Sequence, residues 1–215
     1  MSKFILGIDQ GTTGSTVALM DARGKLRARV NYEFPQIYPC PGWVEQRPAD
    51  IWASVEKGIR AILRKGICKP SEIIAIGITN QRETSLLWDT ETGEPFNRAI
   101  VWQCRRTSEF CESLRAAGHE NAVRRKSGLV LDPYFSASKY RWLLKNTVGI
   151  SKAVTDKRVA AGTVDSFLVW QLTGGDAHVT DVSNASRTSL MNIKTGRWDQ
   201  HLLSLFEVPR ASGVR

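Results

Sequence analysis

FILGIDQGTTGSTVALMDARGKL, residues 4–26, is the stretch that decides the fold of this chain. Two short apolar runs, at 4–8 and 16–20, flank a segment rich in glycine and threonine. Turn residues at 21–24 separate the second run from a third one over 26–34. Short apolar runs joined by short turns predict an antiparallel meander of three strands. The glycine–threonine segment is then expected at the tip of the first hairpin.

The sequence that follows predicts a crossover back to the same sheet. Residues 35–48 contain four prolines and predict a loop, and apolar residues then recur at helical spacing from Pro48 to Gly66. The β-branched run at 73–79 predicts a strand that is covered on both faces and paired in parallel. Further predicted elements are a strand at 86–88 and helices at 106–117, 136–145 and 164–172. This order indicates an α/β fold with a mixed sheet flanked by helices.

The composition is that of an ordinary globular protein. The 215 residues carry a formal charge of +9, and 42% of them are hydrophobic, which suits a single domain over 1–215. No apolar stretch approaches the roughly 18 residues needed to span a bilayer, and the N-terminus predicts no secretory signal, so we expect a cytoplasmic protein. The basic residues are scattered, which argues against nucleic acid as a partner. The cysteines and histidines have no metal-ligand spacing, so no zinc site is expected.

The first candidate site is the segment DQGTTGS, residues 9–15. Its glycines let the backbone approach an anion, its threonines supply hydroxyl donors, and its aspartate could accept a Mg²⁺ or the waters bound to it. The candidate phosphate ligands are Asp9, Gly11, Thr12, Thr13 and Gly14. No lysine follows the last glycine, so a phosphate would be held by amides, hydroxyls and a metal. The alternative is a plain glycine-rich hairpin.

A second candidate site follows the predicted strand at 73–79. Arg82 offers hydrogen-bond donors and Glu83 offers acceptors, and together they could hold the hydroxyls of a polyol. The alternative for this pair is a surface ion pair. Tyr134 follows Pro133 in a predicted turn and could present its hydroxyl to a ligand, although a tyrosine in such a place is by itself more often a half-buried packing residue.

Six segments, taken in order, carry a family resemblance: GIDQGTTGSTVALMD, FPQIYPCPGWVEQRP, AIGITNQRETSLLWD, AIVWQCRRT, SGLVLDPYFSASKYRWLL and VTDVSNASRTSLMNI. From Phe4 to about Pro209 the chain resembles the FGGY carbohydrate kinases, and among them the glycerol kinases. The resemblance implies the ribonuclease H-like fold of the actin, hsp70 and sugar kinase superfamily. It implies ATP and Mg²⁺ as cofactors, with phosphates at Asp9 and residues 11–14 and the metal at Asp9 through water. It also implies a glycerol site at Arg82, Glu83 and Tyr134.

The resemblance further implies how much of an enzyme this chain supplies. The family has two domains with ATP and substrate between them, and its general base is expected beyond residue 215. We therefore expect no catalytic residue within this chain. The chain is expected to be the N-terminal, glycerol-binding half of an enzyme that converts glycerol and ATP to glycerol 3-phosphate and ADP. The C-terminal nucleotide-binding domain is expected to be absent, and the chain alone inactive. A homo-oligomer stays open.

Two departures from the family pattern fall in the phosphate segment. Thr16 stands where glycerol kinases usually have an arginine, and Gly14 stands where a serine is common, so weaker phosphate binding is expected. Two other functions compete with the kinase. One is a non-catalytic module that binds a polyol or a phosphate. The other is a ribonuclease H-like nuclease, for which Asp9 and the +9 charge fit, but that chemistry needs several acids around one site.

Overall fold

The computed structural model describes residues 3–209 and separates into two compact units. The first unit comprises the chain up to Gln36 together with Arg47–Gln81, and the second comprises Ile37–Gln46 and the chain from Arg82 onward. That residues 1–215 form a single domain stays a prediction. The predicted phosphate segment belongs to the first unit, and the predicted glycerol residues belong to the second.

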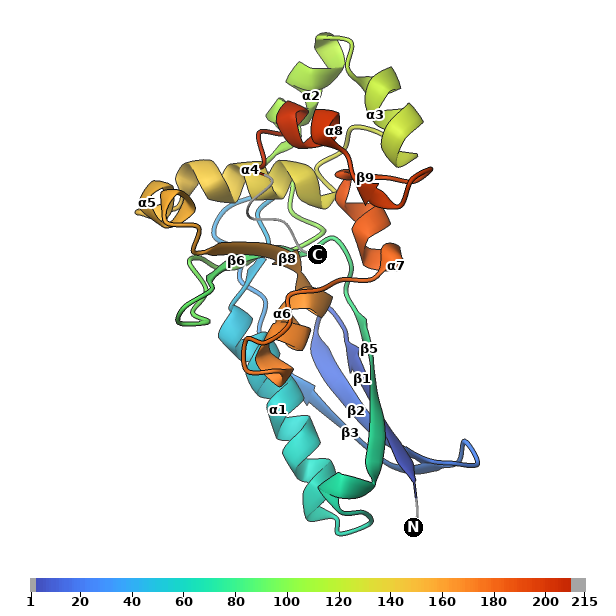
Figure 1. Cartoon of the computed structure of the whole chain (residues 1–215). Helices are drawn as coiled ribbons and strands as arrows, with labels where there is room; N and C mark the ends of the chain where they lie inside the picture. The colour runs from blue at the N-terminus through green and yellow to red at the C-terminus, as the bar shows by residue number, and fades with distance from the viewer. Residues whose placement is uncertain (1–2, 210–215) are drawn as a thin grey trace. The chain divides into compact units, whose positions relative to one another are not determined.

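The first unit is a four-stranded mixed sheet with one long helix. Its strands lie in the order β3-β2-β1-β5, with β1 antiparallel to β2 and parallel to β5 (Figure 1). The elements are β1 (Phe4–Gln10), β2 (Gly14–Asp21), β3 (Leu26–Glu33), α1 (Pro48–Arg64), a 3₁₀ turn η1 (Pro70–Glu72) and β5 (Ile73–Asn80). The antiparallel meander, the crossover helix and the parallel return strand are confirmed.

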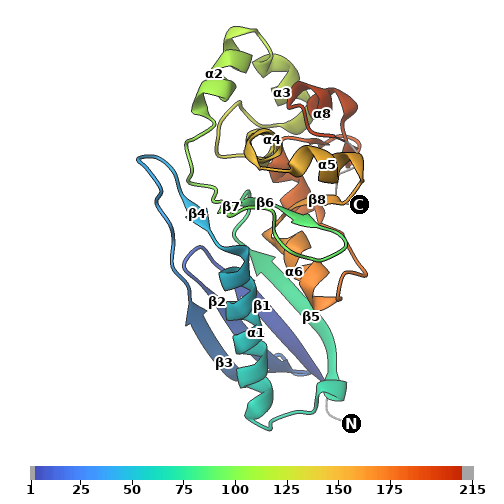
Figure 2. The same cartoon turned by 90° about the vertical axis from the view of Figure 1, so that its left-hand side faces the viewer.

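Helix α1 covers one face of this sheet (Figure 2). Alternate β1 residues, Phe4, Leu6 and Ile8, are buried on that face, as the period of two in a strand requires. The helix lies very close to β2: a Cβ at Gly58 would come within 2.4 Å of the Cγ2 atom of Val17. A side chain at position 58 would therefore push the helix off the sheet.

The prediction that residues 73–79 are covered on both faces is wrong for this structure. Within the described residues β5 pairs with β1 alone, so it forms an edge of the sheet. Ile74 and Ile76 are 59% and 48% exposed. At the opposite edge, the exposed residues of β3 include Arg27 and Arg29, charges of the kind that discourage edge-to-edge association. The sequence predicts a strand both at β5 and at β3. Only the tertiary structure decides that each of them lies at an edge of the sheet.

The second unit is built on an antiparallel sheet in the order β4-β7-β6-β8. Its strands are β4 (Glu45–Gln46), β6 (Ser85–Asp89), β7 (Ala99–Ile100) and β8 (Val159–Thr163). The strand predicted at 86–88 is present and one residue longer at each end. The sequence predicted neither β7 nor β8, and β4 lies in the stretch predicted to be a loop. Strands of two residues are too short to leave a periodic pattern.

Helices cover both faces of β6, whose five residues are all buried. Leu87 belongs to the same buried cluster as Leu143 of α4, whereas the ring of Trp88 packs against Phe167 of α6. The helices are α2 (Ser108–Ala116), α3 (Glu120–Ser127), α4 (Ser136–Asn146), α5 (Ile150–Thr155), α6 (Val164–Leu172), α7 (Val182–Ala185) and α8 (Gln200–Leu205). A 3₁₀ turn η2 (Ser186–Thr188) and a small hairpin of β9 (Met191–Asn192) and β10 (Arg197–Trp198) complete the unit.

A buried ion pair joins β4 to the segment before α2. The guanidinium of Arg106 is 1% exposed and donates from Nη2 to Oε1 of Glu45 at 2.8 Å. It also lies 3.8 Å from the ring centre of Trp43 and 4.6 Å from that of Trp142. Three of the family-like segments of the sequence therefore meet here, and their contact is structural.

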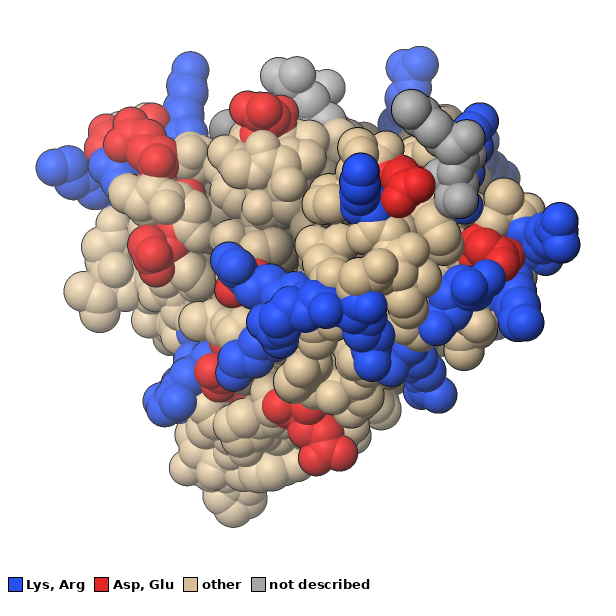
Figure 3. Space-filling view, turned by 90° about the horizontal axis from the view of Figure 1, so that it is seen from below, with Lys and Arg blue, Asp and Glu red and all other residues tan. Residues whose placement is uncertain are grey.

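The basic residues are scattered in the sequence but gather on part of the surface (Figure 3). On the face drawn in Figure 3, lysines and arginines form a band with aspartates and glutamates beside it. Between residues 3 and 209, no helix has the length and apolar character of a membrane-spanning segment.

Candidate functional site

The predicted phosphate segment is the tip of the β1–β2 hairpin. The last strand pair is Gln10 with Ser15, and the N–H of Gly11 donates to the carbonyl of Gly14 at 2.8 Å. The carbonyl of Thr13 accepts a hydrogen bond from the N–H of Phe34 at 3.1 Å, which ties the tip to the chain leaving β3. The tip is thus a short loop at one end of the sheet, held by these two backbone hydrogen bonds.

The two glycines of the tip are required for space. Neither has a positive φ, so neither position needs glycine for its backbone conformation. A Cβ at Gly14 would lie 2.8 Å from the carbonyl oxygen of Tyr32, and a Cβ at Gly11 would lie 3.2 Å from the carbonyl oxygen of Gly14. A side chain at position 14 would therefore push against β3 in this structure.

Asp9 lies inside β1 rather than at its end, because the strand continues to Gln10. Ile8 and Gln10 are buried on the side of α1, so Asp9 is exposed on the open face of the sheet. Its strand partners there are Thr16 on β2 and Thr79 on β5. These three residues help to line a cavity of about 380 Å³ on the open face.

The oxygen atoms of Asp9 and of the neighbouring Thr16 and Thr79 could hold a magnesium ion that keeps most of its bound water. Mg²⁺ is commonly held by one or two carboxylates together with substrate phosphates. Within the described residues there is no group of three or more histidine, cysteine or acidic side chains that could hold a metal by themselves. Thr16 hydrogen-bonds through Oγ1 to Nδ2 of Asn31 at 3.0 Å, so the position where the family has an arginine is occupied here by a neutral, hydrogen-bonded side chain.

In the second unit, Glu83 is buried in an unusual conformation. Its φ is +62°, in the left-handed region that a non-glycine residue rarely adopts, and its side chain is 3% exposed. The backbone carbonyl of Glu83 accepts hydrogen bonds from Oγ of Ser85 at 3.0 Å and Oγ of Ser136 at 3.2 Å. Backbone strain of this kind persists where the surroundings enforce it, and it is frequent at ligand sites.

The ionic partner of Glu83 is Arg187. Nε of Arg187 donates to Oε1 of Glu83 at 2.6 Å, across 104 residues of sequence. Arg82 is exposed, and no ion pair joins it to Glu83 in the described part of the chain. The simple alternative of a surface Arg82–Glu83 ion pair is therefore wrong, because the neighbouring residues point to different surroundings.

Tyr134 lies in an aromatic cluster beside this ion pair. Its ring centre is 5.4 Å from that of Trp102 and 5.4 Å from that of Phe135. The guanidinium carbon of Arg187 is 5.7 Å from the ring centre of Tyr134 and 4.9 Å from that of Phe135. The cluster of Glu83, Tyr134, Trp102, Phe135 and Arg187 is called the Glu83 cluster below.

A buried lysine holds the segment that carries Tyr134. Lys139 is fully buried, and its Nζ donates to the carbonyls of Tyr134 and Phe135, the latter at 3.1 Å. Removal from water lowers the pKa of this amine to about 7, and the nearby carboxylate of Glu83 opposes that shift. The N–H of Tyr134 is in turn held by Oδ1 of Asp132 at 2.8 Å. Tyr134 therefore sits on a tightly fixed turn.

The structure brings Glu83 and Tyr134 into one cluster, as their predicted shared role requires. It adds three members that sequence reasoning did not assign, Arg187, Trp102 and Phe135. All three lie within segments that carry the family resemblance, VTDVSNASRTSLMNI, AIVWQCRRT and SGLVLDPYFSASKYRWLL. Spacing could not connect them to Glu83, since each reaches the cluster from a different part of the chain.

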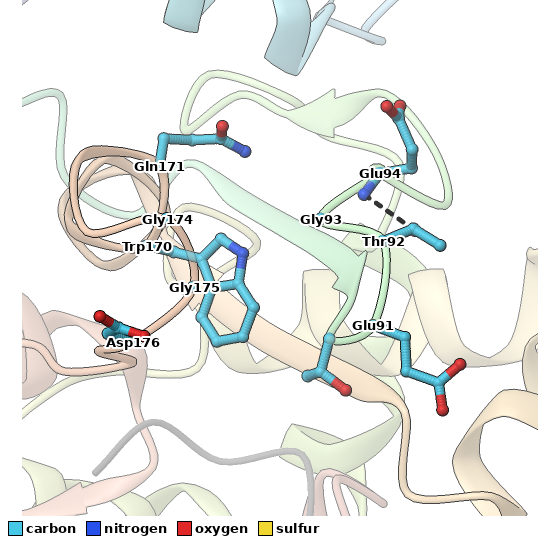
Figure 4. A pocket seen from close by; sticks show the side chains of 10 residues that line it. Glu91, Thr92, Gly93, Glu94, Trp170, Gln171, Gly174, Gly175 and Asp176 are labelled. Carbon is cyan, nitrogen blue, oxygen red and sulfur yellow. Dashed lines mark hydrogen bonds between the residues drawn. The ribbon is translucent and has the colours of Figure 1, made fainter.

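A separate cavity of about 390 Å³ lies between the turn after β6 and the end of α6 (Figure 4). The indole of Trp170 forms one wall, and the carboxylates of Glu91, Glu94 and Asp176 stand around it without converging on one point (Figure 4). None of the predicted site residues lines this cavity. It has no arrangement of groups that indicates a particular ligand.

Comparison with solved structures defines the class of protein. A crystal structure of Plasmodium falciparum glycerol kinase with ADP matches with a TM-score of 0.86 and 34% sequence identity, covering 96% of this chain and 41% of that one. The fold is therefore that of the sugar kinases, as predicted.

Sequence comparison narrows the class to a family. Residues 4–212 match the N-terminal domain of the FGGY family of carbohydrate kinases, and the chain belongs to that family. It is 54% identical to the glycerol kinase of Bdellovibrio bacteriovorus and 50% identical to glycerol kinase 2 of Thermotoga maritima. These matches cover 98% and 97% of this chain, which spans 43% and 42% of the length of those relatives.

Proposed function

We propose that this chain is the acceptor-holding part of an ATP-dependent kinase that phosphorylates glycerol. The observation that carries the proposal is the Glu83 cluster, in which a buried carboxylate in a strained backbone conformation stands beside a tyrosine, a tryptophan and an arginine. The names of the relatives at 50% and 54% identity support glycerol as the acceptor.

The chemistry of the cluster suits a short polyol. Each hydroxyl of glycerol can donate one hydrogen bond and accept others, so it needs both kinds of partner. Glu83 would supply acceptors and Tyr134 a donor, and the exposed Arg82, which lies outside the cluster as defined, is proposed as a further donor. The ring of Trp102, half-buried against Tyr134, offers an apolar wall for the carbon chain.

The hairpin tip and Asp9 are proposed to hold the donor. Gly11, Thr12, Thr13 and Gly14 would contact the phosphates of ATP, and Asp9 would bind Mg²⁺ through water. The crystal structure of Plasmodium falciparum glycerol kinase with ADP supports a nucleotide as the other substrate. The role of the metal, when bound, is to neutralise charge on the phosphates. Asp9, which is exposed on the open face of the sheet, would hold the hydrated ion there.

We propose that the chain by itself binds glycerol but does not phosphorylate it. Phosphoryl transfer depends on positioning and electrostatic stabilisation from both sides of the transferred group. Within residues 3–209 the Glu83 cluster offers no group that the family pattern assigns as general base, and losing such a base costs on the order of 10²–10⁴ in rate. The second candidate is a polyol-binding module without catalysis.

Two measurements on the 215-residue chain test the proposal. Glycerol should change the tryptophan fluorescence saturably, since Trp102 adjoins the site, and 1-propanol, which lacks the neighbouring hydroxyls, should not. Glu83→Gln should weaken glycerol binding about tenfold, because a bond to a charged group contributes roughly 1.5–3 kcal/mol. Absence of saturation with the folded chain would refute the acceptor site. Glycerol-dependent release of ADP at about one turnover per second, the lower end for kinases, would refute inactivity.

A further inference from the structure

We infer that Arg187 is a positioning residue for the polyol: it holds the carboxylate of Glu83 in the orientation that receives the acceptor hydroxyl. This inference rests on the proposed function of the Glu83 cluster. It adds a residue that lies in a family-like segment but is not among the expected glycerol ligands.

The first observation is the geometry of the ion pair. The carboxylate of Glu83 is 3% exposed, so it needs a compensating charge, and Arg187 supplies one through Nε at 2.6 Å from Oε1. A guanidinium has five N–H donors in a planar fork. One is used on Oε1, and the side chain of Arg187 is still 29% exposed. The side chain is therefore only partly covered while it holds Glu83.

The second observation is that Arg187 touches both halves of the cluster. Its guanidinium lies 4.9 Å from the ring of Phe135 and 5.7 Å from that of Tyr134, while its Nε holds Glu83. A guanidinium this close to the face of an aromatic ring is attracted by the ring. The arginine therefore fixes the spacing between the carboxylate and the aromatic segment, which are 51 positions apart in sequence.

The segment that carries Arg187 is itself held in place. Asp181 caps α7, its carboxylate accepting from the N–H groups of Ser183 and Asn184 at 2.6 and 3.0 Å. One turn later, Oγ1 of Thr188 donates to the carbonyl of Ala185 at 2.7 Å. An arginine on a fixed turn can define the position of its partner, which an arginine on a loose loop could not.

Lys139 does not duplicate this role. It adds positive charge near Glu83, but its Nζ donates to the carbonyls of Tyr134 and Phe135. Loss of Arg187 would leave the carboxylate of Glu83 without its direct partner and free to rotate. Small errors in the placement of a binding group weaken the productive complex far more than its charge alone suggests.

The chain offers a matched control at Arg141. Its Nε donates to Oε1 of Glu207 at 2.9 Å, and its guanidinium lies 3.8 Å from the ring centre of Phe110, so it has the same two kinds of contact as Arg187. It takes no part in the Glu83 cluster. Arg141→Met therefore removes the same two kinds of contact outside the proposed site, although Glu207 is more exposed than Glu83 and keeps Lys145 as a partner.

The test is a glycerol titration of the 215-residue chain and its variants, followed by tryptophan fluorescence, with circular dichroism to verify folding. Arg187→Met should weaken glycerol binding tenfold or more, as loss of an interaction of about 1.5 kcal/mol or more predicts. Arg187→Lys should bind with intermediate affinity, because it keeps the charge but loses the planar fork. Arg141→Met should stay within about twofold of the wild type, since it leaves the site intact.

A double variant separates positioning from general stability. If Arg187 acts through Glu83, then Glu83→Gln with Arg187→Met should bind no worse than Glu83→Gln alone. Wild-type affinity in folded Arg187→Met, or an equal loss in Arg141→Met, would overturn the inference while the proposed function stands. If Arg187→Met does not fold, unchanged affinity in Arg187→Lys overturns it instead. Absence of glycerol binding by the folded wild type would reject the proposed function, and with it this inference.

Discussion

Replacing Arg106 by methionine is expected to destabilise the second unit severely. The change keeps the length of the side chain and most of its packing between Trp43 and Trp142, but it removes the cation. Glu45, whose side chain is 10% exposed, then retains only the half-exposed Arg98, at 3.2 Å. Removing one partner of a buried ion pair costs about 3–5 kcal/mol, because the other charge is left uncompensated.

The expected loss can be resolved into contributions. The hydrogen bond from Arg106 to the carboxylate at 2.8 Å accounts for roughly 1.5–3 kcal/mol. The stacking of the guanidinium on two indoles, at 3.8 and 4.6 Å, adds roughly 1–2 kcal/mol. Together these agree with the range for a broken buried pair. For a chain of this size the melting temperature should fall by roughly 6–20 °C.

Urea unfolding followed by circular dichroism measures this loss, provided that the transition is two-state. The matched control is Arg60→Met, which breaks an exposed pair with Glu56 and should cost less than about 1 kcal/mol. The double change Glu45→Met with Arg106→Met should cost less than the sum of the single changes, since neither charge is then left alone. If Arg106→Met lowers the free energy of unfolding by less than about 1 kcal/mol, the Arg106–Glu45 contact does not act as a buried ion pair that stabilises the fold.

Two further predictions concern stability and association. Burial lowers the pKa of His178 to about 4, and only the unfolded chain takes up its proton between about pH 6.5 and 4. The free energy of unfolding should therefore fall as the pH is lowered through that window. In urea titrations at pH 7 and 4.5, His178→Phe should remove part of this fall. The same pH dependence in the variant and the wild type would contradict the prediction. Ile76 is exposed on the edge strand β5, and Ile76→Lys should reduce self-association of the chain as measured by light scattering. An increase in self-association would argue against association through this edge.

The parts of the fold that the sequence predicted are those set by local patterns. The meander over residues 4–34 follows from short apolar runs and turn residues, and the helix from Pro48 follows from its apolar period and its proline at the first turn. The strand at residue 73 was predicted as a strand with parallel pairing, both of which hold. The predicted burial of this strand was wrong, since burial depends on which other segments pack against the strand, and the local sequence pattern does not identify them.

The candidate site divides in the same way. Glu83 and Tyr134 could be selected from the sequence because each follows a recognisable element and carries the family pattern. The φ of +62° at Glu83 and its pairing with Arg187 could not, because a side chain 104 residues away supplies the contact. The spatial need for glycine at position 14 was also hidden, since the obstructing atom belongs to Tyr32 on another strand.

By itself, then, the sequence determined the kind of each long element, the hairpin that carries the phosphate segment and the family to which the chain belongs. These depend on interactions between residues close in sequence, or on motifs whose order is itself the signal. Only the tertiary structure decided which charges pair, which strand forms an edge and which side chains surround Glu83. Those outcomes depend on distances between segments brought together by packing, and no local spacing encodes them.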